Sequence, residues 1–498
     1  MNKKSLIILA LGLASVSAVA APPGSKNFEE FRRGMHQRYD SFREEMLSNY
    51  AKFLDGEWVE FKWFPADERD ATPKPQEAPQ APAVPERGPV TPLASPKPAL
   101  PLATAPVADA APGRPAFDRS SAPADYETPA PDATADAFDF DFYGVKMSAP
   151  QIDLRIMNRM TDTNDYASQW RELASTRESG RLVSAIAAIA REHRFNDYLT
   201  FDLARRYVLA RFPEASAASR TSLVHYIMAN LGYDVRIGCT PDGEAVLMMP
   251  CLQTVYGKTY LMFGQEKYYV FTDPTVDLST RRMAISTCQL PAVANTGKKI
   301  DLDFNPVLLP VNPKEFTITD GNLTITGTIN ANLYPIIYRY PQMPISGYAH
   351  SQLDPSVRAS IVEQLKEQLA GKPQEQAVDE LLNFVQKGFA YATDDEAHGF
   401  EKPYFFEETL FYPECDCEDR VIFYTYLLWN VLGVENHLLA FPGHESAAVA
   451  LGTERTGDSY TYEGKHFLIS DPTFIGARTG MCMPSYKSVT PEIDHIYK

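Results

Sequence analysis

Basic residues and long apolar runs are both scarce in this chain. Its 47 Lys and Arg residues stand against 64 Asp and Glu residues, so the formal net charge at pH 7 is −17. Basic surfaces bind nucleic acid and anionic lipid, and this balance therefore excludes both as general partners. No stretch after residue 20 approaches the roughly 20 consecutive apolar residues of a membrane span, so we expect no span in the processed chain.

Cysteine is scarce as well. The chain has six cysteines, at positions 239, 251, 288, 415, 417 and 482, which are too few for a disulfide framework in an exported protein of this size. Structural zinc sites typically repeat the spacing Cys-x₂₋₄-Cys in two pairs, and this pattern is missing. We expect no metal and no organic cofactor, and at least one thiol that is free for chemistry.

Residues 1–20 have the features of a signal peptide. Two lysines precede an apolar run over residues 6–19, and the run ends in Ala-Val-Ala, the small-x-small pattern that signal peptidase recognises. The sequence predicts cleavage before Ala21 and a periplasmic or secreted protein. The first cysteine is Cys239, so we expect no lipid anchor at the cleavage site.

The region 21–64 contains a helical pattern. An aromatic or methionine side chain recurs every three or four residues, at Phe28, Phe31, Met35, Tyr39, Phe42, Met46, Tyr50 and Phe53. This spacing predicts an amphipathic helix. Two interpretations stay open, because the apolar face could pack on the core of its own protein or dock on a separate protein partner.

The region 65–135 is rich in proline. Sixteen of the 39 prolines lie between Pro73 and Pro131, with almost no aromatic residue among them. Such a composition cannot bury enough apolar surface to fold, so we predict a disordered linker that acts as a semi-stiff spacer. The alternative is a proline-rich ligand for a partner domain.

The rest of the chain contains two similar halves. The segment Arg211–Val235 matches Phe411–Asn436 at an offset of 200 residues, and Asp-Pro-Thr follows both, at Asp273 and Asp471. We predict an α+β fold with two tandem copies of one unit, at 136–300 and 350–498. Residues 301–349 should form a β-rich connecting segment, because the stretch 316–340 alternates around an Asp-Gly turn.

The strongest chemical signal lies at the start of a predicted helix in the second copy. Asp416 is a good N-cap and Asp419 follows three residues later, so a helix should begin at Cys417 and end at Gly433. Backbone N–H groups and the helix dipole favour a thiolate in the first turn. Four carboxylates between residues 414 and 419 act in the opposite direction, so the thiol needs a cationic neighbour.

Two further residues complete a candidate triad. His444 follows a Pro-Gly turn at the start of an apolar strand and could act as a general base, and Asp471 ends a later strand and could orient the imidazole. Other interpretations are open. Cys417 could be an inert buried thiol, a zinc ligand, or half of a disulfide with Cys415 or Cys482, and Asp471 could be a simple turn residue.

Three segments carry a family resemblance: "DCEDRVIFYTYLLWNVLGV", "GHESAAVAL" and "FLISDPTF". In this order they resemble the transglutaminase-like superfamily of papain-like cysteine enzymes. The resemblance covers the last 120 or so residues and, more weakly, 181–290. It implies Cys417 as nucleophile, His444 as base and Asp471 as the residue that orients the base. It assigns no oxyanion donor, and Tyr404 and Tyr412 are the candidates.

The first copy lacks two of the three residues. It keeps Asp273, but Ala217 stands opposite the cysteine and Gly243 opposite the histidine. We therefore expect this copy to be catalytically inactive.

Two functions are compatible with this pattern. The first is an exported cysteine-dependent acyl-transfer enzyme that acts on an amide bond of a protein or peptide, by hydrolysis rather than crosslinking. The second is a non-catalytic periplasmic module that binds a partner. The enzyme hypothesis predicts an accessible Cys417 with a depressed pKa, and the binding hypothesis predicts a buried or oxidised Cys417.

Overall fold

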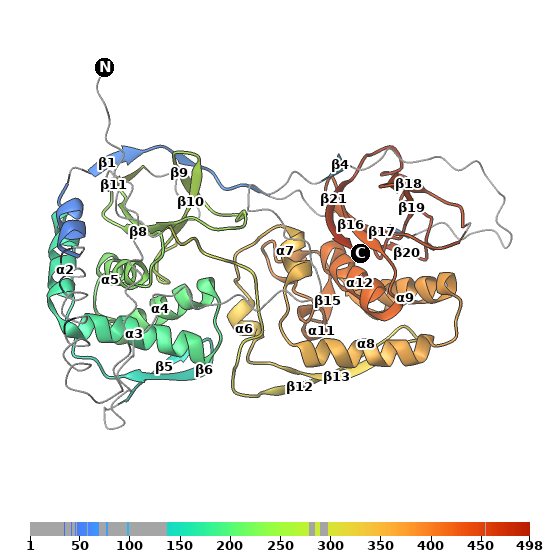
Figure 1. Cartoon of the computed structure of the whole chain (residues 1–498), viewed down its shortest axis with the longest axis horizontal. Helices are drawn as coiled ribbons and strands as arrows, with labels where there is room; N and C mark the ends of the chain where they lie inside the picture. Colours follow the sequence, from blue (N-terminus) through green and yellow to red (C-terminus); the bar gives the residue numbers. More distant parts are fainter. Residues whose placement is uncertain are drawn as a thin grey trace, which may run out of the picture.

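A computed structural model gives the fold of the chain (Figure 1). It describes residues 47–56, 58–68, 76–77, 97–98, 137–277, 284–288, 297–453 and 455–498, and the single positions 34, 41 and 45. The protein is a mixed α+β protein, as predicted. None of the helices in the described ranges is long and apolar enough to cross a membrane. The predicted signal peptide lies outside the described residues.

The first unit is an antiparallel sheet covered by helices. Its strands are β1 (Trp58–Phe61), β2 (Trp63–Phe64), β7 (Arg236–Cys239), β8 (Ala245–Met249), β9 (Tyr260–Phe263), β10 (Glu266–Phe271) and β11 (Ile285–Cys288). The helices are α2 (Asn164–Ser175), α3 (Arg177–Glu192), α4 (Asp197–Arg211) and α5 (Ala217–Asn230), preceded by the hairpin β5 (Ala137–Phe142) and β6 (Val145–Pro150). Helix α5 packs against β7 and β8.

The second unit has a similar construction. Its larger sheet contains β16 (Asn436–Phe441), β17 (His444–Val449), β18 (Ser459–Tyr462), β19 (Lys465–Ile469) and β21 (Glu492–Tyr497). Its longer helices are α8 (Pro355–Leu369), α9 (Gln374–Gly388) and α12 (Cys417–Leu432), and its short elements are α6 (Tyr334–Ile337), α7 (Ile345–His350), β14 (Ala390–Tyr391), α10 (Asp394–Ala397), α11 (Glu408–Phe411), β15 (Glu414–Cys415) and β20 (Phe474–Ile475). Helix α12 packs against β16 and β17.

The two sheets share one strand order. The first contains the run β11-β7-β8-β10-β9 and the second contains β21-β16-β17-β19-β18. Equivalent strands also occur in the same order along the chain, and α5 precedes the first set as α12 precedes the second. The internal repeat seen in the sequence therefore corresponds to a repeated topology.

Strand pairing aligns the candidate residues of the two units. The equivalent pairs are Ala448 with Ile469 in the second sheet and Leu247 with Phe271 in the first. Asp471 lies two residues after Ile469, and Asp273 lies two residues after Phe271. His444 lies four residues before Ala448, and Gly243 lies four residues before Leu247. The strand register therefore supports the alignment made from the sequence.

The connecting segment 301–349 contains one hairpin and two short helices. The hairpin consists of β12 (Pro313–Thr319) and β13 (Thr324–Asn330), paired around the predicted Asp-Gly turn. It precedes α8 as the hairpin β5–β6 precedes α2. The hairpin thus occupies the same position in the second unit as β5–β6 does in the first.

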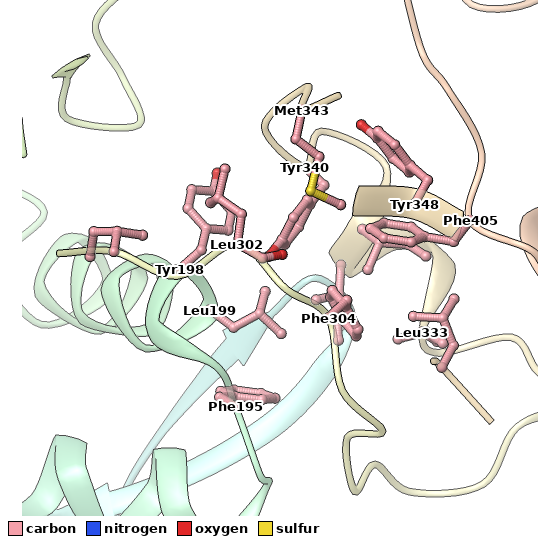
Figure 2. Close-up of a cluster of buried hydrophobic side chains, with 14 of the residues drawn as sticks. Phe195, Tyr198, Leu199, Leu302, Phe304, Leu333, Tyr340, Met343, Tyr348 and Phe405 are labelled. Atoms are coloured by element: carbon pink, nitrogen blue, oxygen red, sulfur yellow. The ribbon is translucent and has the colours of Figure 1, made fainter. Parts of the chain in front are cut away.

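A continuous apolar core joins the two units (Figure 2). The ring of Tyr340 lies 4.9 Å from that of Tyr198 in α4 and 5.5 Å from that of Phe405 in the second unit. Its hydroxyl accepts a hydrogen bond from Asn196 at 2.7 Å and donates to the Leu302 carbonyl at 2.8 Å. The buried hydroxyl is therefore satisfied, and the junction is packed as a core.

The N-terminal segment up to residue 64 packs on the first unit (Figure 1). Helical residues 47–54 place Tyr50 against the first unit, where its ring lies 4.5 Å from that of Trp170 and its hydroxyl 2.8 Å from His225 Nε2. The described end of the predicted amphipathic helix thus packs on its own protein. Most of its other apolar positions lie outside the described residues.

The proline-rich region contributes two short strands, which corrects part of the prediction of a disordered linker. Strand β3 (Gln76–Glu77) pairs in parallel with β20, and β4 (Lys97–Pro98) pairs in parallel with β21. Main-chain pairing of this kind requires only extended backbone, which a proline-rich chain favours. The rest of the region 69–136 lies outside the described residues.

Candidate active site

The candidate nucleophile occupies the predicted position. Helix α12 begins at Cys417 and ends before Gly433, which adopts a left-handed conformation with φ of 63°. Asp416 is the N-cap, and its backbone N–H donates to Asp419 Oδ2 at 3.1 Å. The helix boundaries predicted from the capping residues are confirmed.

The candidate base and its orienting residue are in contact. His444 is the first residue of β17, and its Nε2 lies 2.8 Å from Asp471 Oδ2. The other oxygen, Asp471 Oδ1, accepts the backbone N–H groups of Thr473 and Phe474 at 2.8 and 3.2 Å. Both side chains are buried. The pair therefore fixes the imidazole ring and leaves Nδ1 as the nitrogen that could accept a proton from a nucleophile.

The thiol lies beside this pair. The backbone N–H of Glu445, next to His444 in β17, faces the Cys417 sulfur and lowers its pKa, although other effects are larger. Tyr486 stacks on the His444 ring at 4.9 Å. Burial raises the pKa of the Tyr486 hydroxyl, and the nearby Cys417 and Asp471 raise it further. The structure thus places Cys417 against the residue that follows His444, and only His444 and Asp471 are in direct contact.

The electrostatics of the thiol differ from those that the enzyme hypothesis predicts. The Cys417 residue is only 1% exposed, and its sulfur donates to Glu418 Oε2 at 3.1 Å. Burial raises the pKa of the thiol, and the charges of Glu418 and Asp416 raise it further, to well above its ordinary value. Burial and the neighbouring carboxylates together outweigh the backbone N–H of Glu445. In this structure Cys417 is therefore a neutral, buried thiol.

The cysteines are not paired. Among the described residues Cys239, Cys251, Cys415, Cys417 and Cys482 are all free thiols. The disulfide alternatives for Cys417 with Cys415 or Cys482 are therefore absent from this structure.

Buried carboxylates surround the start of α12. Oxygens of Asp394, Asp416 and Asp419 lie within 4.8 Å of one another, and so do oxygens of Asp394, Glu401 and Glu418. Burial and mutual repulsion raise the pKa values of Asp416 and Asp419 well above the ordinary range. Carboxylate oxygens are the ligands that Ca²⁺ and Mg²⁺ prefer, so a metal ion could be held here, an arrangement that sequence reasoning did not foresee.

Two tyrosines that the sequence did not suggest, Tyr391 and Tyr486, interact electrostatically with the thiol. The two candidates that it did suggest both contact His398: the Tyr404 hydroxyl bonds to its imidazole, and the Tyr412 ring lies 5.1 Å from the same imidazole. Burial raises the pKa of the Tyr391 hydroxyl, and the charge of Cys417 raises it further. Tyr391 and Tyr486 come from segments that are far apart in sequence, so no local signal could have identified them.

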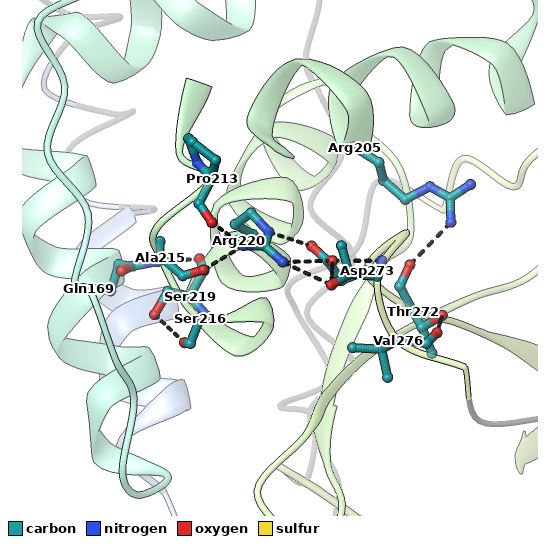
Figure 3. A network of polar contacts seen from close by, with 11 residues as sticks. Gln169, Arg205, Pro213, Ala215, Ser216, Ser219, Arg220, Thr272, Asp273 and Val276 are labelled. Carbon is teal, nitrogen blue, oxygen red and sulfur yellow. Dashed lines mark hydrogen bonds and ion pairs between the residues drawn. The ribbon is translucent and has the colours of Figure 1, made fainter. Parts of the chain in front are cut away.

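The first unit uses its aspartate differently (Figure 3). Arg220 in α5 donates to both oxygens of Asp273, at 2.8 and 2.9 Å, and to Thr275 Oγ1 at 3.0 Å. The register places Gly243, which has a φ of 87°, where the second unit has its histidine. The equivalent of the orienting carboxylate is thus held by a permanent cation, which supports the prediction that the first copy is inactive.

Comparisons with protein-family models, curated proteins and solved structures found no match.

Proposed function

We propose that the chain is an exported, transglutaminase-like enzyme that transfers the acyl group of an amide through Cys417. The observation that carries the proposal is the His444 to Asp471 contact of 2.8 Å beside a thiol in the first turn of α12. A nucleophile, a base within reach and a carboxylate that orients the base are the parts that covalent acyl transfer requires. The repeated topology, with the two units as tandem transglutaminase-like domains, agrees with this assignment.

The chemistry starts from a neutral thiol. The Cys417 side chain turns from Glu418 towards His444, and Nδ1 takes the thiol proton as the sulfur attacks the amide carbonyl. The backbone N–H groups at the start of α12 face the developing oxyanion. The imidazolium, stabilised by Asp471, returns the proton to the leaving amine. Water then attacks the thioester, His444 accepts its proton, and the acid and the free thiol are released.

One observation favours a second candidate, a non-catalytic binding module. The thiol is buried, its pKa is raised, and it already donates to Glu418, which is the state that the binding hypothesis predicts. The accessible thiol with a depressed pKa that was expected of the enzyme is not found, so the proposal rests on a general-base mechanism, which does not require a preformed thiolate. The raised pKa of Cys417 argues only against a resting ion pair between a Cys417 thiolate and a His444 imidazolium in this structure.

Acylation by 4-nitrophenyl acetate separates the two candidates without knowledge of the substrate. We expect a stoichiometric release of nitrophenolate with acetyl on Cys417, located by mass spectrometry in a Cys415→Ser background. Removing a general base costs about 10²- to 10⁴-fold, so His444→Ala should slow the burst by this factor, and Cys417→Ala should abolish it. Equal bursts in wild type and His444→Ala, or an unacylated Cys417 in folded protein, would leave the binding module as the function.

Localisation follows from the N-terminus in this proposal. Residues 1–20 would be removed on export to the periplasm or medium, and N-terminal sequencing of the protein recovered from a secreting host should begin at Ala21. An N-terminus at Met1 would contradict export by this route.

A further inference from the structure

Gln386 makes an unusual number of contacts for one side chain. It lies near the end of α9 and is buried. Its Nε2, which carries two hydrogens, donates to the carbonyls of Asp471, Phe474 and Ala477 at 3.1, 2.9 and 3.1 Å with one hydrogen shared between two of them, and its Oε1 accepts the backbone N–H of Gly476 at 3.0 Å. One amide therefore holds the whole loop 471–477 against α9.

This loop is the support of the candidate orienting carboxylate. Asp471 begins it, and its Oδ1 accepts backbone N–H groups from within the same loop. The direction of Oδ2 towards His444 is consequently fixed by the loop backbone. Since Gln386 binds the carbonyl of Asp471 itself, it acts on the position of this residue directly.

Arg420 extends the connection to the nucleophile. It lies three residues after Cys417 in α12 and is only 1% exposed. Its Nη1 donates to the Gln386 carbonyl at 3.3 Å and its Nη2 to the Phe389 carbonyl at 2.8 Å. The helix that carries the thiol and the loop that carries the carboxylate therefore meet at Gln386.

The first unit shows what happens without this arrangement. Arg220 is the counterpart of Arg420 at the offset of 200 residues, and it bonds to Asp273 instead of to α3. When Leu182 of α3 is aligned with Ala377 of α9, the buried faces of the two helices largely coincide and Arg191 stands opposite Gln386. Arg191 is exposed. The amide that holds the loop is thus missing from the unit in which the arginine binds the aspartate.

We propose that Gln386 is a positioning residue: its side-chain amide anchors the loop of Asp471 on α9, so that Asp471 stays available to His444. The effect of Gln386 on catalysis rests on the proposed function, whereas its effect on the His444 to Asp471 contact does not. The positioning role and the proposed function can therefore be refuted separately.

The contact can be measured by NMR on the full chain labelled with ¹⁵N-histidine. A hydrogen-bonded imidazole N–H gives a downfield proton signal, and His444→Gln assigns the signal by its loss. In Gln386→Met, which keeps the volume but loses four hydrogen bonds, we expect this proton to exchange with water at least about tenfold faster. Asn436→Leu is the matched control, because this buried amide donates to the Thr425 and Val434 carbonyls away from the loop.

The proposal would be overturned if the His444 imidazole proton stayed protected from exchange in folded Gln386→Met. It would also be overturned if this proton exchanged equally fast in Asn436→Leu. If Gln386→Met is insoluble, Gln386→Glu is measured in its place, since a carboxylate can accept from Gly476 but cannot donate to the three carbonyls. A signal that is lost in Gln386→Glu supports the proposal, and one that persists overturns it. The nitrophenyl acetate burst, measured in parallel, reports on the proposed function alone. If the wild type shows a protected histidine signal but no burst, the positioning role of Gln386 stands and the proposed enzymatic function is refuted.

Discussion

The buried ion pair between Arg220 and Asp273 is predicted to stabilise the fold of the first unit. Arg220 and Asp273 are joined by two hydrogen bonds of 2.8 and 2.9 Å, and their side chains are 6% and 3% exposed. Removing one partner from such a pair leaves an uncompensated buried charge, which costs about 3–5 kcal/mol. Asp273→Asn should therefore lower the free energy of unfolding by this amount at pH 7.

The double variant tests the mechanism of this loss. In Arg220→Met/Asp273→Leu neither charge is left alone, so we expect a smaller loss than the sum of the losses in Arg220→Met and Asp273→Leu, with a coupling energy of about 1–3 kcal/mol. Urea denaturation followed by circular dichroism measures these three variants, Asp273→Asn and the wild type. Asp139→Asn is the control, because Asp139 forms an exposed ion pair with Lys146 and should change little. An Asp273→Asn loss below about 1 kcal/mol, or additive single variants, would refute the argument.

The same pair predicts a pH dependence. Burial raises the pKa of Asp273, but the hydrogen bonds from Arg220 and Thr275 outweigh burial, so its pKa in the folded state is lowered. A lowered carboxyl pKa contributes stability above the ordinary value of about 4 and loses this contribution as the pH falls below it. The difference in stability between wild type and Asp273→Asn should therefore shrink below pH 4. A difference that stays constant down to pH 2 would contradict this assignment.

Three further predictions concern the second unit. Glu418→Gln removes the carboxylate that raises the Cys417 pKa, so iodoacetamide should label Cys417 faster at pH 8 than in wild type; an unchanged rate would show that burial alone controls the thiol. Burial and repulsion raise the Asp416 pKa, so the contribution of this carboxyl group to stability falls as the pH rises above about 4. Asp416→Asn, which keeps an N-cap residue, should melt higher at pH 7 but not at pH 3, and equal melting temperatures at pH 7 would contradict it. Gly433→Ala places a Cβ at a φ of 63° and should cost about 1–2 kcal/mol in urea denaturation, whereas no loss would mean that the helix end rearranges.

Local chemistry explains what the sequence predicted well. The start of α12 follows from Asp416 and Asp419, because capping depends on residues within one turn. The duplication was visible since both copies keep the same order, with nearly equal spacing between the helix and Asp-Pro-Thr: 56 residues from Ala217 to Asp273 and 54 from Cys417 to Asp471. The placement of His444 at the start of β17 follows from the Pro-Gly turn before an apolar run.

Contacts between distant segments explain what the sequence did not predict. The Glu418 side chain is adjacent to Cys417 in the chain, but only the fold buries both and turns the thiol towards this carboxylate. Tyr486 reaches His444 from a loop near the C-terminus. The proline-rich strands β3 and β4 pair through backbone alone, and two residues without a hydrophobic alternation give no pattern to recognise.

Asp273 and Asp471 are buried and each has a partner, and the identity of this partner links structure to chemistry in both units. In the first unit the partner of Asp273 is an arginine, which cannot give up its proton and can only stabilise. In the second unit the partner of Asp471 is a histidine, which satisfies the equivalent carboxylate and, unlike arginine, can act as a general base. The His444 to Asp471 contact therefore serves the fold whether or not the unit is an enzyme. A loss of acylation in His444→Ala is consequently meaningful only at a temperature where that variant is shown to be folded. The acylation experiment then tests whether the neutral thiol of Cys417 reacts with the help of this pair.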